Sequence, residues 1–179
     1  MAHTHSPEHA HDPQTDIACA MAHGEAEAPT GERRLVAVFA SPVATQLVHL
    51  AAHVGFECVV LDPAGDLDGV RTVRSTAEAG IDEHTDVVVT DHDRAELGDV
   101  LAAVLETPAR WVGVMGSPRH TAPHVAALRE RGLPADRIAR VHRPIGLDIG
   151  SRAPAEIAVS TVAGLLADRN GRDGGTYRA

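Results

Sequence analysis

A short stretch, Gly116-Ser117-Pro118-Arg119, has the residue types of an anion-binding turn. It follows an apolar run and opens a predicted helix, with Ser117 suited to the N-cap and Pro118 to the first helical position. Backbone N–H groups at a helix N-terminus favour negative charge, and an arginine fork can hold a phosphate through two hydrogen bonds. From the residues alone, a phosphate cradle containing Gly116, Ser117 and Arg119 and an ordinary capped helix with a solvated arginine are equally good interpretations.

A second candidate binding loop, residues 143–152, is long for a connection between a strand and a helix. Prolines and glycines, Gly146 among them, constrain its backbone. Asp148 and Arg152 could pair with each other or act together on a ligand. Both interpretations stay open on the residues alone.

A third candidate loop contains Asp91-His92-Asp93. Asp93 stands three residues before Glu96 and has the spacing of a capping box, so we expect it to cap the following helix. His92 could orient or protonate a ligand, with flanking acids setting its charge state. A solvent-facing histidine is an equally good interpretation.

The loop after the first predicted strand, Ala40-Ser41-Pro42-Val43-Ala44, stands where a dinucleotide fold has its glycine-rich turn. It contains no glycine, and Pro42 lacks an N–H donor. Asp62 stands where a ribose-binding acid would lie. Because the glycine-rich turn is missing, an intact NAD(P) site is not expected, even with an acid at that position.

Strands and helices that alternate along the chain must position these loops. Apolar runs predict strands at 35–40, 57–61, 86–90, 111–115 and 140–142, with a possible short strand at 70–73. Helical spacing predicts helices at 43–54, from Asp93 to about 105, from Ser117 to about 131, and at 154–167. The alternation predicts an α/β, Rossmann-like doubly wound parallel sheet in a single domain, residues 34–168.

The two ends of the chain differ from this pattern. Residues 1–33 are rich in histidine, proline and acids, and we expect a disordered His-rich tail. Residues 169–179 are expected to form a flexible C-terminal tail. Histidine clusters can bind metal, so the weak metal-ligand candidates in the N-terminal tail are His3, His5, His9, His11, Cys19 and His23.

Composition excludes several function classes. All 16 basic residues are arginines, so lysine Schiff-base chemistry and a Walker-type phosphate loop are excluded. Four aromatic residues are too few for a nucleic-acid stacking surface. No apolar run suggests a membrane span or signal peptide, and we expect a cytoplasmic protein. Residues 107–179 carry 11 arginines against six acids, which suits an anionic ligand or partner.

Two segments together resemble the Rossmann domain of the XdhC/CoxI family. They are Val112-Gly113-Val114-Met115-Gly116-Ser117-Pro118-Arg119 and Pro144-Ile145-Gly146-Leu147-Asp148-Ile149-Gly150-Ser151-Arg152-Ala153-Pro154-Ala155-Glu156-Ile157-Ala158. The family patterns read roughly VGLIGSRRK and PIGLDIGARTPEEIA. His92 and Asp93 also stand where the family has a His-Asp pair. The resemblance spans about residues 34–168.

The resemblance implies an accessory protein of molybdenum hydroxylases, of the xanthine dehydrogenase or carbon monoxide dehydrogenase type. Such a protein would act as a chaperone rather than an enzyme: it would bind molybdenum cofactor (molybdopterin or its dinucleotide form), assist its sulfuration, and pass it to the apoenzyme. The implied partners are the apoenzyme and a cysteine desulfurase-type sulfurase. Apart from the resemblance, a homodimer is also a prediction, although no exposed apolar stripe in the sequence marks its surface. No catalytic residue is assigned. The implied cofactor-binding residues are Gly116, Ser117, Arg119, His92, Asp93, Gly146, Asp148 and Arg152.

The chain departs from the family at the first turn, where the family has a GAGHVA-like sequence, and at Ala153, where it has a capping threonine. Longer members also carry a separate N-terminal domain. Two alternatives therefore remain: an NAD(P)-binding oxidoreductase-like module, and an interaction subunit that docks on a hydroxylase without any cofactor.

Overall fold

The computed structural model describes residues 20, 23, 33–117 and 122–175. The chain divides into two units, Met1–Gly31 and Glu32–Ala179. In the first unit the structure describes Ala20, in a helix, and His23, an exposed turn residue. The predictions for the rest of the histidine-rich tail therefore lie outside the described residues.

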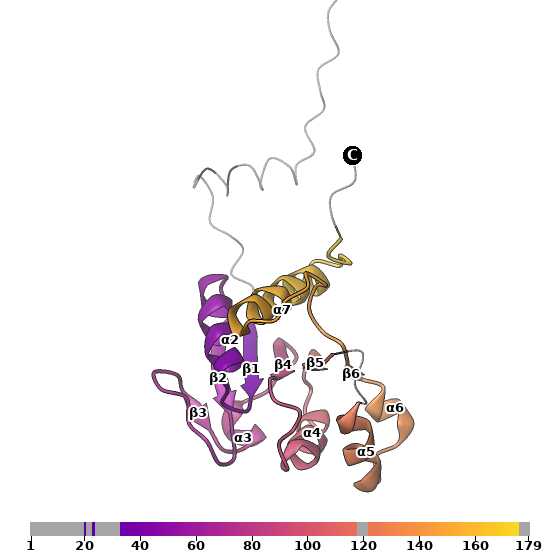
Figure 1. The fold of residues 1–179 in the computed structure, drawn as a ribbon. Helices are drawn as coiled ribbons and strands as arrows, with labels where there is room; N and C mark the ends of the chain where they lie inside the picture. Colours follow the sequence, from indigo (N-terminus) through magenta and orange to yellow (C-terminus); the bar gives the residue numbers. More distant parts are fainter. Residues whose placement is uncertain (1–19, 21–22, 24–32, 118–121, 176–179) are drawn as a thin grey trace, which may run out of the picture. The chain divides into compact units, whose positions relative to one another are not determined.

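The second unit contains a six-stranded, wholly parallel sheet in the order β3-β2-β1-β4-β5-β6 (Figure 1). The strands are β1 (Arg34–Val38), β2 (Glu57–Leu61), β3 (Thr72–Val73), β4 (Thr85–Val89), β5 (Trp111–Val114) and β6 (Val141–His142). Their near-continuous apolar runs follow from burial on both faces: all five residues of β4 are buried. The order reverses at β1, whose Val38 pairs with Leu61 on one side and Val89 on the other.

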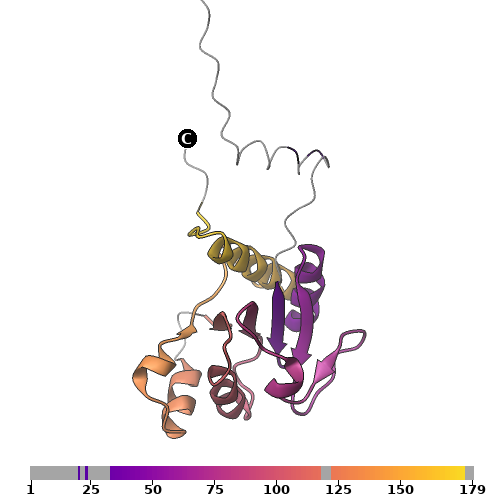
Figure 2. The same ribbon diagram turned by 180° about the vertical axis from the view of Figure 1, so that it is seen from behind.

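Helices cover both faces of the sheet, which confirms the doubly wound Rossmann-like fold (Figures 1 and 2). One face carries α2 (Pro42–His53) and α7 (Pro154–Arg169), which pack against each other. The other carries α3 (Thr76–Ala79), α4 (Leu97–Leu105), α5 (Pro123–Glu130) and α6 (Ala135–Ile138). Within the described residues, no helix has both the length and the apolar character that crossing a bilayer would require.

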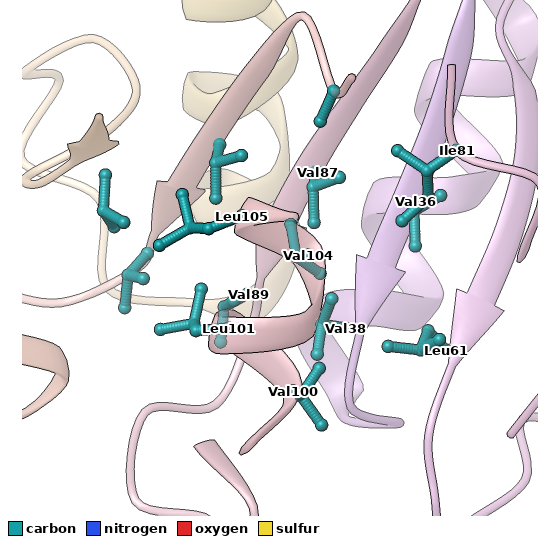
Figure 3. Packing of buried hydrophobic residues seen from close by; sticks show 14 of the residues in the cluster. Val36, Val38, Leu61, Ile81, Val87, Val89, Val100, Leu101, Val104 and Leu105 are labelled. Carbon is teal, nitrogen blue, oxygen red and sulfur yellow. The ribbon is translucent and has the colours of Figure 1, made fainter. Parts of the chain in front are cut away.

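Alternating strand residues divide the core into two layers. Figure 3 shows Val36, Val38, Val87 and Val89 of the central strands beside the inner face of α4. The intervening residues Leu35, Ala37 and Val88 lie in a second cluster with α2 and α7. Because each central strand contributes side chains to both apolar layers, its polar side chains are confined to the strand ends.

Two predicted helix starts are wrong. Helix α4 begins at Leu97, and its N-cap Glu96 makes no side-chain capping bond, so Asp93 does not cap it. The Asp93 amide instead donates to the Asp91 carboxylate in a turn. Helix α5 begins at Pro123 with Ala122 at its N-cap, so Ser117 does not cap that helix. Helices α3 and α6 were not predicted because four residues show no helical period.

A buried ion-pair network ties the end of α7 to the start of β4. The fully buried Asp86 carboxylate accepts hydrogen bonds from Arg110 Nε at 2.6 Å and Arg169 Nε at 2.7 Å. Arg110 also bonds Asp168 at 2.6 Å. Each oxygen of the Asp86 carboxylate is therefore paired with an arginine at the amino-terminal edge of the sheet.

Replacing Asp86 should be strongly destabilising, because two arginines would lose their buried partner. We expect Asp86→Ala to lower the free energy of unfolding by about 3–5 kcal/mol in urea denaturation. The control Asp99→Ala breaks the ion pair between Asp99 and Arg131, in which the Asp99 side chain is 76% exposed. That loss should be below about 1 kcal/mol. Equal losses in the two variants would contradict the network's role.

Candidate functional site

The loops after β1, β4, β5 and β6 share the carboxyl edge of the sheet, because all strands run parallel. An open cleft of about 470 Å³ lies there between the starts of α2 and α7. Its lining is Pro42, Thr45, Gln46, Ala153, Pro154 and Ala155. The predicted site residue Arg152 directly precedes this lining. Two helix N-termini, with their positive dipole ends, therefore border one cleft.

The start of α7 keeps backbone donors available. Ala153 at the N-cap has no side-chain acceptor, and Pro154 has no N–H. The Glu156 carboxylate accepts from the amides of Arg152 at 3.0 Å and Ala153 at 3.2 Å, and these bonds lower the pKa of Glu156. Within the described residues, the amides of Ala155 and Glu156 have no acceptor, as expected for an uncapped first turn. An anion in the cleft could accept from them.

Hydroxyl groups connect the first two loops across the point where the strand order reverses. Thr90 Oγ1 lies 2.8 Å from the carbonyl oxygen of Phe39 and donates to it, so Ser41 must donate in its 2.9 Å contact with Thr90. Ser41 Oγ in turn accepts from the Ala44 amide and caps α2. Ser41 and Thr90 therefore hold the loops in place, and the single hydroxyl proton of each is used within the protein.

Asp62, which directly follows β2, is the centre of a polar cluster at this edge. Its side chain is fully buried and accepts from Ala40 N at 2.8 Å and from both terminal nitrogens of Arg94, at 3.1 and 3.2 Å. The amides of Ala64 and Gly65 donate to it at 2.9 and 2.8 Å. Burial alone would raise the pKa of Asp62, but these hydrogen bonds outweigh burial and lower the pKa to about 2.

The lowered pKa of Asp62 predicts a specific loss of stability in acid. Because the folded-state pKa of about 2 lies below the ordinary 3.8, ionised Asp62 stabilises the fold above about pH 4. This stabilisation, about 2 kcal/mol, should be lost as the pH falls toward 2. In urea denaturation at a series of pH values, Asp62→Asn should therefore lose less stability than the unmodified protein over that range. Parallel pH profiles for the two proteins would contradict the prediction.

The loop after β5 is joined to the loop after β6 by Arg143, a residue that we did not predict. Arg143 Nη2 donates to the carbonyl oxygen of Ser117 at 3.2 Å. A Cβ on Gly116 would lie 2.5 Å from the same guanidinium, so a side chain at this position would displace Arg143. The predicted residues Gly116 and Ser117 thus do lie beside an arginine. The predicted Arg119 lies outside the described residues.

His124, in the first turn of α5, is a second residue that we did not predict. It is 4% exposed, and its Nδ1 has no hydrogen-bond partner within the described residues. Burial lowers the pKa of His124, and the positive charge of Arg143 lowers it further. A neutral histidine therefore lies near the arginine that joins the two loops.

Gly146 lets the second predicted loop pack closely against α7. The amide of Leu147 donates to the carbonyl of Ser160, and Ser160 Oγ donates to the carbonyl of Leu147. A Cβ on Gly146 would lie 2.5 Å from Ser160 Oγ. The loop therefore lies directly on α7. Asp148 and Arg152 of the same loop are exposed, and the Asp148 carboxylate accepts from the Gly150 amide at 3.4 Å.

Two glycines of this loop provide a matched test of the close packing on α7. Gly146 and Gly150 both have positive φ, +83° and +69°, but no atom lies within 4 Å of a Cβ built on Gly150. We expect Gly150→Ala to cost about 1–2 kcal/mol for its backbone conformation. Gly146→Ala should cost a further ~1–3 kcal/mol for overpacking against Ser160. Thermal unfolding of both variants measures the difference, and equal costs would contradict the packing argument.

His92 and Asp93 lie together in the loop after β4. His92 Nε2 is 3.7 Å from Asp93 Oδ1, with side chains 27% and 87% exposed. Both can reach solvent at the carboxyl edge. For the metal prediction, no group of three His, Cys, Asp or Glu side chains is arranged to hold a metal ion among the residues that the structure describes. The candidates His3, His5, His9, His11 and Cys19 lie outside those residues.

A family model described as the XdhC Rossmann domain matches residues 35–165, which include every loop described above. This chain belongs to the XdhC Rossmann-domain family. The family identification confirms the resemblance that the two glycine-containing segments indicate.

Relatives of this XdhC domain are longer proteins. The uncharacterized protein YqeB of Escherichia coli K12 is 30% identical over 154 residues, which cover 79% of this chain and 28% of YqeB. A solved structure from Bacillus halodurans, described as a xanthine dehydrogenase, matches with a TM-score of 0.60 and 26% identity. That match covers 78% of this chain and 45% of the other. The chain thus spans less than half the length of both relatives.

Proposed function

We propose that this XdhC domain binds molybdenum cofactor and passes it to a molybdenum hydroxylase of the xanthine dehydrogenase type. Membership of the family supports the link to that enzyme class. The single observation that carries the binding proposal is the cleft between α2 and α7, where backbone donors at the start of α7 lack acceptors. The cofactor bears a phosphate, which such donors bind well.

The residues present fit such a ligand. A volume of about 470 Å³ lies within the range of small-molecule sites, about 300–1,000 Å³. In this proposal the amides of Ala155 and Glu156, together with Arg152, hold the phosphate. Gly116, Ser117, His92 and Asp148 would line the neighbouring part of the edge, with Arg119 and Arg143 supplying further positive charge. The protein would hold the cofactor and exclude water from it, while the cofactor supplies the redox chemistry of the hydroxylase.

Transfer to the enzyme requires partners. The proposal includes the apo-hydroxylase as the acceptor and a cysteine desulfurase-type sulfurase that acts while the cofactor is held. A second copy of the chain is a further proposed partner. Because the relatives are longer than this chain, each of these interactions is proposed rather than inherited from them.

Cofactor binding can be tested on the purified chain. Cofactor released from a molybdenum hydroxylase is added, the protein is separated by gel filtration, and retained pterin is measured by fluorescence after oxidation. We expect Arg152→Ala, and also Arg119→Ala, to weaken retention about 10- to 100-fold, the value of one charge-assisted hydrogen bond. The control Arg172→Ala removes an exposed arginine beyond α7 and should retain pterin normally.

Absence of retained pterin in the unmodified chain would contradict the proposal. Co-purification with a hydroxylase while no pterin is bound would favour the cofactor-free interaction subunit. Equal retention by all three variants would exclude Arg152 and Arg119 from the site.

A further inference from the structure

Asp62 occupies the position at which dinucleotide-binding domains recognise a ribose. It directly follows β2, which lies next to the strand where the order reverses, and it follows the first loop residue Ala40 by 22 positions. In nucleotide-binding relatives of the fold, an acid about 20 residues after the first turn binds the ribose hydroxyls. The carboxylate is therefore at the position where the ribose of a nucleoside would be bound.

The Asp62 carboxylate has no capacity left for a ligand. A carboxylate offers about four lone-pair sites, and Asp62 already accepts five hydrogen bonds, three from backbone amides and two from Arg94. A Cβ on Gly65 would lie 2.7 Å from Asp62 Oδ2, so the following loop wraps closely around the carboxylate. Ribose hydroxyls would have to displace some of these donors.

Arg94 covers this carboxylate from the solvent side. Its side chain is 25% exposed, whereas that of Asp62 is fully buried. The guanidinium lies 4.7 Å from the ring centroid of Phe39 and also pairs with Glu96 at 3.1 Å. Phe39 directly follows β1 with a φ of 72°, and its side chain is fully buried. Arg94 therefore lies over both the first loop and the acid.

The same cluster uses the donor that a phosphate would need at the first turn. The Ala40 amide donates to Asp62 at 2.8 Å, and Pro42 has no N–H. The internal carboxylate thus takes the place of an external anion at this turn. A ligand with two nucleotide-like halves, which must span the reversal point, meets one half of the crevice already filled.

We propose that Arg94 seals the nucleoside-binding half of the crevice and is the specificity-determining residue that restricts this domain to ligands without a nucleoside at that position. Where the proposed function also holds, the seal selects the monophosphate form of the pterin cofactor over its dinucleotide form. Arg94 acts through Asp62 and does not itself contact the selected ligand.

The seal can be tested with adenosine as the probe, by isothermal titration calorimetry on the full chain, because adenosine has the ribose diol but no phosphate that could bind at the start of α7. The unmodified protein should show no saturable binding. Arg94→Ala should bind at least about tenfold more tightly than the unmodified protein, because Asp62 regains acceptor capacity. The gain should be lost with 2′-deoxyadenosine and in the double variant Arg94→Ala/Asp62→Asn, since both remove the contact between ribose diol and acid.

Arg131→Ala provides the matched control, since it removes a partly exposed arginine that pairs with Asp99, away from the crevice. It should gain no affinity for the probe. Circular dichroism establishes that each variant is folded, and Arg94→Gln, which keeps the aliphatic stem over Phe39, replaces Arg94→Ala if the latter does not fold. Probe binding by the unmodified protein, or a folded Arg94 variant without any gain, would overturn the proposal.

Failure of the seal and failure of the proposed function have different signatures. A chain that retains no pterin contradicts cofactor binding, whereas the comparison with adenosine, which has no phosphate, is unaffected. Equal retention of the monophosphate and dinucleotide forms of the pterin would overturn the selection between them while leaving cofactor binding intact.

Discussion

The buried carboxylate of Asp62 holds the carboxyl edge of the sheet together. It accepts hydrogen bonds from Ala40 in the loop after β1, from Ala64 and Gly65 in its own loop, and from Arg94 in the loop after β4. A buried charge of this kind is tolerated because every lone pair is satisfied and an arginine fork neutralises it. The loops after β1, β2 and β4 are thereby joined through one side chain.

A second carboxylate, Asp86, has the same role at the opposite edge. It is also fully buried, and it pairs with Arg110 and Arg169, so that the last turn of α7 is fastened to the start of β4. A chain without lysine meets both requirements with arginine, whose planar fork bonds two acceptors at once. Because the first turn of α7 borders the cleft and its last turn is fastened to β4, the position of the proposed site depends on both edges of the sheet.

The carboxyl edge divides into two halves of different character. Over β1 and β2 the polar groups are paired with one another, through Asp62, Arg94 and the Ala40 amide. Around α7, backbone amides at the start of the helix have no acceptor within the described residues, and Arg152 is exposed. This difference between the two halves is the basis of our proposal that the domain takes a small anionic ligand rather than a dinucleotide.

The sequence by itself determined the architecture and the family of this protein. Apolar runs of strand length alternate with helical spacing, and burial on both faces leaves a parallel sheet as the arrangement that satisfies them. The glycine-containing segments around Gly116 and Gly146 indicated the family because they are contiguous in the chain. Contiguous signals of this kind survive without knowledge of the fold.

Only the tertiary structure decided which side chains meet. Arg94 contacts Asp62, 32 residues away, and Arg143 contacts Ser117, 26 residues away, and no local pattern marks either pair. Such contacts also explain why α4 starts later than predicted: residues 91–94 form a turn and an ion pair instead of the first turn of that helix. Hydrogen bonds between distant residues depend on the pairing of strands, and spacing along the chain carries no record of that pairing.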